Sequence, residues 1–200
     1  AILVINGCHK VDKLEVPGVL VNPSIMQEIF FSNNAPVNPL VKAMNMFLQR
    51  QNDTLKYVEK TVKQIGYPIW NKAIIFSKKT SSGRGSSIGD STDIIYIPFV
   101  RENQNYVNAT MIVQASPNDT NFSYICDWEY SQRQYGLNNA DSSAEHTAAF
   151  FMLFDKEVFG HTEFKITDAD LFADHPMDSQ SLTRTVYLTD STSTHGRASN

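Results

Sequence analysis

The stretch from Asn38 to Gly66 constrains the fold most strongly, because it predicts a long helix with a marked start and end. Asn38 is a preferred N-cap residue, and Pro39 suits the first helical position, where its missing N–H costs nothing. Gly66 suits the position just after a helix. Between them, apolar residues recur at the spacing of one helical face: Leu40, Val41, Met44, Phe47, Leu48, Leu55, Val58, Val62 and Ile65. The sequence therefore predicts one helix about 40 Å long.

The segment after Gly66 changes from helical to extended periodicity. Four runs rich in β-branched and aromatic residues are separated by Gly, Ser, Asn, Asp and Pro, and they are Ile69–Phe76, Ile94–Val100, Val107–Gln114 and Phe122–Trp128. Their close spacing favours an antiparallel meander, since parallel neighbours need crossovers of a dozen or more residues. Pro98 lies inside the second run, which predicts an edge strand or a bulge.

A second helix is predicted to begin near Ser142 and to end at Gly160. Residues 162–166 and 185–188 are further candidate strands, whereas residues 189–200 have the composition of a flexible tail. The predicted fold class is α+β, with an antiparallel sheet of four or more strands packed against one long and one shorter helix. We expect a single domain over residues 38–188, preceded by a linker that contains one or two helical turns at Ile25–Phe31.

The first residues resemble the end of a bacterial lipoprotein signal peptide. Ala1–Val4 is apolar, and Ile5-Asn6-Gly7 precedes Cys8, although Asn6 is atypical of such sites. On this interpretation residues 1–7 are a signal remnant, Cys8 carries the lipid, and residues 8–37 form a tether and linker. The alternative is a β-hairpin turning at Asn6-Gly7.

Charge and composition narrow the classes of partner. The net charge is −4, and no basic block with interleaved aromatic residues indicates nucleic-acid binding. No run of 18 apolar residues predicts a membrane span. The second cysteine, Cys126, lies in a β-like run, where a lone thiol is usually a small buried hydrophobe; a disulfide with Cys8 is possible in an oxidising compartment.

Two groups of side chains are candidate sites. A glycan or peptide platform would use aromatic residues of the strands, namely Trp70, Tyr96 and Trp128, unless these residues form the core. A divalent metal would use imidazoles and carboxylates near the C-terminus, namely His161, Asp168, Asp170 and His175, although their spacing matches no known motif and equally suits acidic turns. The sequence predicts no cofactor, since the loop from Lys78 to Gly89 lacks the ending of a phosphate-binding loop, and it contains no recognisable catalytic motif.

Three short stretches resemble landmarks of uncharacterised secreted or lipoprotein-type proteins of the Bacteroidetes: residues 66–73 (GYPIWNKA), 97–100 (IPFV) and 154–161 (FDKEVFGH). The resemblance covers roughly residues 40–172 and implies a cell-envelope location, periplasmic or on the outer membrane surface. That group has no assigned catalytic residue, so none carries over.

These observations favour a lipid-anchored envelope protein that acts as a binding or assembly module, with an envelope protein or a glycan as its partner. The alternative is an envelope hydrolase, with or without a metal ion, that has its site near His161–His175. A purely structural envelope protein is the third hypothesis.

Overall fold

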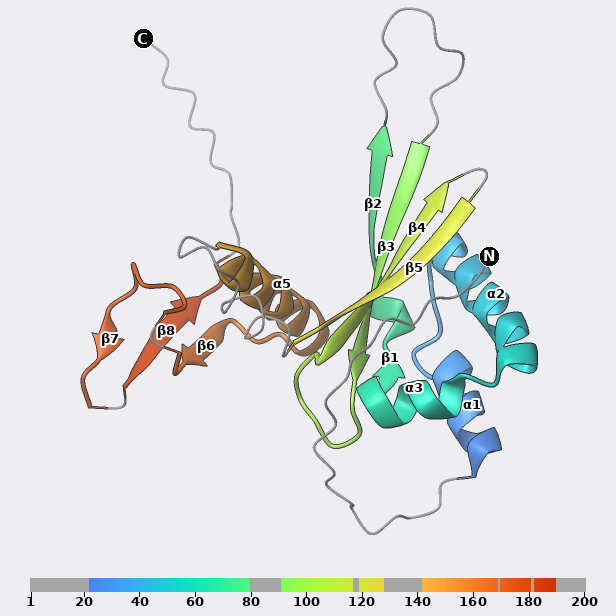
Figure 1. The fold of residues 1–200 in the computed structure, drawn as a ribbon, viewed down its shortest axis with the longest axis horizontal. Helices are drawn as coiled ribbons and strands as arrows, with labels where there is room; N and C mark the ends of the chain where they lie inside the picture. Colours follow the sequence, from blue (N-terminus) through green and yellow to red (C-terminus); the bar gives the residue numbers. More distant parts are fainter. Residues whose placement is uncertain are drawn as a thin grey trace, which may run out of the picture.

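A computed structural model describes residues 22–79, 91–116, 119–127, 142–168, 170–180 and 182–189. Within these residues the chain has an α+β fold, as the sequence predicted. A five-stranded antiparallel sheet lies between three helices on one side and a single helix on the other, and a smaller three-stranded sheet lies beyond that last helix (Figure 1). No helix in the described ranges combines the length and the apolarity needed to cross a membrane.

The main sheet is an antiparallel meander in which β3 pairs with β4 and β4 pairs with β5. On its other side β3 pairs with two strands, β1 and β2, which are separated by a short 3₁₀ turn. This arrangement confirms the predicted meander. The strands are β1 (Tyr67–Pro68), β2 (Ile74–Lys79), β3 (Ser91–Val100), β4 (Ala109–Ser116) and β5 (Asp119–Cys126).

Pro98 does not lie on an edge strand, because β3 has neighbours on both sides. The expectation of an edge strand was therefore wrong. The carbonyl oxygen of Pro98 accepts a hydrogen bond from the Ile69 N–H at 2.8 Å, at the point where the 3₁₀ turn separates β1 from β2. The backbone nitrogen of Pro98 lies on the side of β3 where the 3₁₀ turn interrupts the pairing between strands. Its lack of an N–H group therefore costs no hydrogen bond between paired strands.

The predicted long helix is two helices, α2 (Pro39–Leu55) and α3 (Val58–Ile65). Asn38 caps α2 through its side chain, as predicted. The break comes at Lys56, which adopts a left-handed conformation with φ 50°. The buried Asn52 side chain accepts a hydrogen bond from the Val58 N–H, and so supplies an acceptor for the first turn of α3. The apolar spacing continued across the break, and for that reason it did not reveal the turn.

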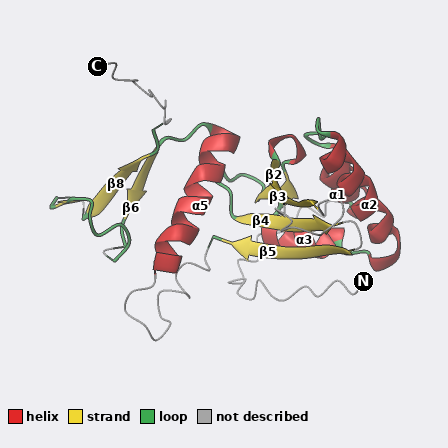
Figure 2. Cartoon of the chain, turned by 90° about the horizontal axis from the view of Figure 1, so that it is seen from above, coloured by secondary structure: helices red, strands yellow, loops and turns green. Residues whose placement is uncertain are grey.

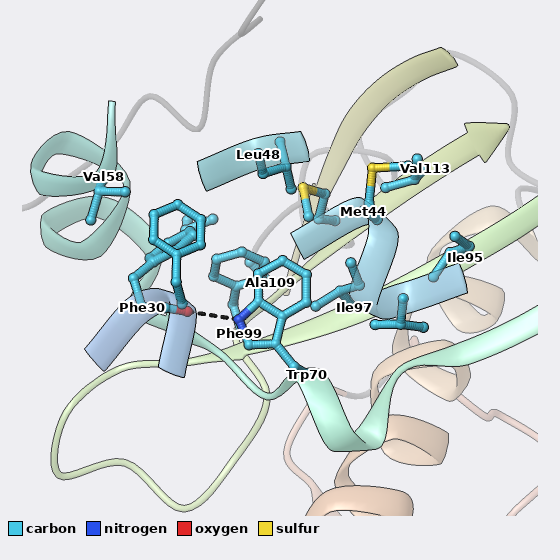
Figure 3. Packing of buried hydrophobic residues seen from close by; sticks show 14 of the residues in the cluster. Phe30, Met44, Leu48, Val58, Trp70, Ile95, Ile97, Phe99, Ala109 and Val113 are labelled. Carbon is cyan, nitrogen blue, oxygen red and sulfur yellow. Dashed lines mark hydrogen bonds between the residues drawn. The ribbon is translucent and has the colours of Figure 1, made fainter. Parts of the chain in front are cut away.

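Helix α1 (Pro23–Ser32) is part of the fold and not a linker. Its Phe30 and Phe31 are buried in the main core. This core fills the space between α1–α3 and one face of the main sheet, and the indole N–H of Trp70 donates to the carbonyl oxygen of Phe30 across it (Figure 3). The segment predicted to be a linker therefore contributes two of the aromatic side chains that cover the sheet.

Helix α5 (Ser142–Phe159) packs on the opposite face of the main sheet (Figure 2). Its other side contacts the second sheet, which has the order β6-β8-β7. These strands are β6 (Glu163–Ile166), β7 (Met177–Asp178) and β8 (Thr183–Tyr187), and two of them confirm predicted strands. The described layers are therefore three helices, the main sheet, α5 and the small sheet.

Candidate functional site

Helix α5 covers only one end of the sheet face on which it packs. Along each strand, side chains alternate between the two faces. On β3, Ile95 and Ile97 enter the core beneath α1–α3, whereas Tyr96 packs with Phe150 and Phe154 of α5. The helix crosses near the ends of β3 and β5 that adjoin Val100 and Ile125, so the opposite ends of the strands extend beyond it (Figure 1).

The part of this face that no described helix covers consists of side chains that the strand register places side by side. Phe76 pairs with Ile94, Ile94 with Gln114, and Gln114 with Asn121. In the next row towards α5, Ile112 pairs with Ser123. We call these residues the open face, and its six members are Phe76, Ile94, Ile112, Gln114, Asn121 and Ser123.

The open face combines one exposed aromatic ring with amides and a hydroxyl. The Phe76 side chain is 59% exposed, and Gln114, Asn121 and Ser123 are also exposed. Ile94 and Ile112 are half-buried between them. None of the six side chains carries a charge. The surface is thus suited to a ligand that has both an apolar side and hydrogen-bonding groups.

Tyr96 links the open face to α5. Its ring lies edge-on to Phe76, with the centroids 5.7 Å apart, and it contacts Phe150 at the same centroid distance. A change at Phe76 therefore affects a ring that also packs against α5. Of the three aromatic residues that the sequence proposed for binding, Tyr96 is the one that the structure places beside an exposed ring.

Trp70, the second predicted aromatic residue, does not lie on this surface. Trp70 is only 1% exposed and belongs to the core on the opposite side of the sheet, so it cannot contact a ligand there. Trp128 lies outside the described residues. Residues 80–90, which include most of the loop that lacks the ending of a phosphate-binding loop, also lie outside them.

The predicted metal ligands are not gathered into a metal site. Among the residues that the structure describes, no group of three or more His, Cys, Asp or Glu side chains could hold a metal ion. Asp168 accepts a hydrogen bond from the backbone N–H of Asp170, which is the geometry of a turn. Arg184 donates to the carbonyl oxygens of His175 and Asp168, and so ties β8 to this loop. His161 lies elsewhere and stacks on Phe159.

Asp155 is a carboxyl group that the sequence analysis did not identify, and it lies where α5 packs against the end of the main sheet. Asp155 accepts a hydrogen bond from the Val107 N–H, which joins α5 to the connection between β3 and β4. Burial raises the pKa of Asp155, and the charge of Asp127 adds to this effect, whereas the Val107 hydrogen bond and His161 oppose it. In the sequence Asp155 resembles any solvated helix residue, so only the packing of α5 reveals it.

Replacing Asp155 with Asn is expected to change the pH dependence of stability. The raised pKa means that protonation of Asp155 stabilises the fold fully below its ordinary pKa of 3.8, and that this contribution is lost as the pH rises through the folded-state pKa. Asn keeps an oxygen acceptor for Val107 without the buried charge. The free energy of unfolding of Asp155→Asn relative to wild type should therefore increase from pH 3 to pH 7 in denaturant titrations. A difference that does not vary with pH contradicts this.

Cys126 lies at the end of β5, is 1% exposed and is disulfide-bonded. It faces the main core, as the β-like run predicted, but it is not a free thiol. Cys8, the other cysteine of the sequence, lies outside the described residues, so its lipidation stays a prediction.

Comparison of the chain with protein-family models, with curated proteins and with solved structures found no match.

Proposed function

We propose that this protein is exported to the cell envelope, is held there by a lipid on Cys8, and acts as a binding module through the open face. The observation that carries the binding role is the uncovered part of the sheet face. Three helices cover the other face of the sheet. On this face an aromatic ring and two amide side chains are exposed, and the pairing of the strands places them in one row across the sheet. Where an aromatic side chain lies in an interface, it often contributes much of the binding energy.

The disulfide of Cys126 supports export, because disulfides persist in oxidising compartments and are rare in the cytosol. It also bears on the anchor. Cys8 is the only other cysteine in the sequence, and a sulfur atom within a disulfide cannot also carry a thioether-linked lipid. Acylation of Cys8 therefore requires that Cys126 pair with a cysteine outside this sequence, whereas a bond between the two cysteines removes the anchor but keeps the envelope location.

The intact mass of the protein from the membrane fraction of its native cells tests the envelope location and the lipid anchor. We expect a mature chain that begins at Cys8 and carries added acyl mass. Non-reducing peptide mapping then identifies the partner of Cys126. A peptide in which Cys8 is linked to Cys126 overturns the lipid anchor, and a cytosolic chain with both thiols reduced overturns export as well.

Replacing Phe76 with Ala should weaken binding to the native envelope about tenfold or more, which corresponds to a loss of roughly 1.4 kcal/mol or more of binding free energy. Phe76 supplies the exposed ring of the open face, and truncation of an aromatic residue that contacts a partner often costs this much. The measurement is the fraction of purified protein that cosediments with washed envelopes over a range of concentrations.

The matched control is Tyr187→Ala. Tyr187 is an equally prominent aromatic residue, 64% exposed, but it lies on β8 of the small sheet. This variant should bind as the wild type does, and circular dichroism should show that both variants keep the native fold. Binding that is equal in wild type, Phe76→Ala and Tyr187→Ala would place the binding site elsewhere and refute the proposed role of the open face.

A further inference from the structure

The contact between α5 and the main sheet, which we call the α5 interface, is small compared with the core on the other side of the sheet. Among the described residues, three side chains are buried in it, Val107, Phe151 and Phe154, whereas sixteen are buried beneath α1–α3. Burial of apolar surface is the main stabilising term, and parts of a protein that share little of it open separately. Helix α5 should therefore leave the sheet more easily than the main core unfolds.

A hydroxyl group beneath α5 has no hydrogen-bond partner among the described residues. Thr110 lies on β4 between Pro98 and Ile125, and it is 0% exposed. Its neighbours Ala109 and Met111 enter the main core, so the Thr110 side chain faces α5. A buried hydroxyl group without a partner destabilises the packed arrangement, and contact with water would satisfy it. Separation of α5 from the sheet relieves this cost.

The carboxyl group of Asp155 is a second polar group in the α5 interface. It accepts a hydrogen bond from the Val107 N–H, and the titratable groups that act on it in the described structure are His161 and Asp127. Burial raises the pKa of Asp155, and Asp127 adds to this effect, so the ionised carboxyl group fits the packed interface less well than the protonated one. Protonation therefore stabilises the packed arrangement at low pH, and this contribution is lost as the pH rises through the raised pKa.

Helix α5 and the small sheet are held to each other by contacts that separation from the main sheet leaves intact. The carboxyl group of Glu145 on α5 accepts a hydrogen bond from the Phe172 N–H at 2.7 Å. Met152 of α5 is buried with Ile166 of β6 and Val186 of β8 (Figure 2). Residues 160–162 alone connect the end of α5 to β6. The helix and the small sheet should therefore move together.

We propose that α5 and the small sheet separate from the main sheet as one unit while the core beneath α1–α3 stays folded, and that this opening is more frequent at neutral than at acidic pH. The opening uncovers Tyr96, Thr110 and Ile125, which continue the sheet face on which the open face lies. Only this last consequence, a longer binding surface, rests on the proposed function.

Native-state hydrogen exchange of the purified protein tests the opening. The Val107 N–H donates across the α5 interface and reports on separation, whereas the N–H of Met111, a residue 1% exposed in the main core, reports on unfolding of that core. At pH 7 the protection factor of Val107 should be at least about tenfold lower than that of Met111. It should fall further in low concentrations of urea, because separation exposes surface and a local fluctuation does not.

Two variants assign this exchange to the α5 interface. Thr110→Val removes the unpaired hydroxyl group and should raise the protection factor of Val107 about fivefold. Trp70→Phe weakens the main core and should lower the protection factor of Met111. It should leave that of Val107 unchanged, since α5 separates while the core is folded.

A matched pair of variants on α5 tests the pH dependence. The protection factor of Val107 in wild type should fall between pH 4 and pH 7. Asp155→Asn should remove this dependence, whereas Glu145→Gln should keep it, because Glu145 contacts the small sheet and not the main sheet.

Three results overturn the inference. Equal protection of Val107 and Met111, lowered equally by Trp70→Phe, means that α5 leaves the sheet only when the whole protein unfolds. Exchange of Val107 that responds neither to urea nor to Thr110→Val is a local fluctuation and not separation of a unit. A Val107 protection factor that is the same at pH 4 and pH 7 removes the role of Asp155. None of these results affects the envelope-binding assay, so the proposed function is tested separately.

Discussion

Gly66→Ala should lower the free energy of unfolding by about 4 kcal/mol or prevent folding altogether. Gly66 ends α3 with φ 90°, in the region that side chains rarely adopt. A Cβ atom there would lie 2.2 Å from the carbonyl oxygen of Val100 and 2.6 Å from the Cα atom of Arg101. Both are backbone atoms at the end of β3, so relief of the clash requires the helix to move away from the sheet.

Gly160→Ala is the matched control, because Gly160 also has a positive φ, 78°, but a Cβ atom there meets nothing within 4 Å. It should cost only the backbone strain, about 1–2 kcal/mol. Urea titrations of the two variants and the wild type separate the clash from the strain. Equal losses in the two variants would show that α3 and β3 are not packed as closely as the structure places them.

Trp70→Ala should lower the free energy of unfolding by about 3–5 kcal/mol, the usual cost of truncating a large buried aromatic residue. The Trp70 side chain is 1% exposed, and its Nε1–H donates to the Phe30 carbonyl oxygen at 2.7 Å. It thereby joins the turn between β1 and β2 to helix α1, which is 40 residues earlier in the chain.

Trp70→Phe divides this cost into packing and hydrogen bonding. Phenylalanine keeps most of the buried ring but leaves the Phe30 carbonyl oxygen without its donor, which should cost about 1–3 kcal/mol. Denaturant unfolding followed by far-UV circular dichroism measures both variants. If Trp70→Ala is as stable as wild type, α1 does not pack on the sheet, and the segment before Pro39 is the linker that the sequence suggested.

The candidate site was only partly predictable. An aromatic platform on the sheet was a sound hypothesis, but the choice among aromatic residues depended on which face each side chain occupies, and a single sequence does not fix the register of a strand to one residue. Trp70 was therefore named as a candidate for the platform, with the core as the alternative, and it lies in the core; Phe76, the exposed ring, was not singled out. Gln114 and Asn121 come together only through the pairing of β3, β4 and β5.

By itself the sequence determined the elements that depend on local physical chemistry. The cap at Asn38, the helix end at Gly66, the β-rich runs that form β3, β4 and β5, and the helix before Gly160 each follow from residues within a few positions of one another. The first β-rich run, Ile69–Phe76, contains a 3₁₀ turn, and only its last three residues belong to β2. The tertiary structure decided the rest. Helix α1 is buried because Phe30 and Phe31 pack against the sheet, and the hydrogen bond that joins it to Trp70 spans 40 residues. The break at Lys56 is local, since Asn52 and Val58 are six residues apart, but no Gly or Pro marks it in the sequence. The open face exists because α5 lies across one end of the strands and leaves their opposite ends uncovered.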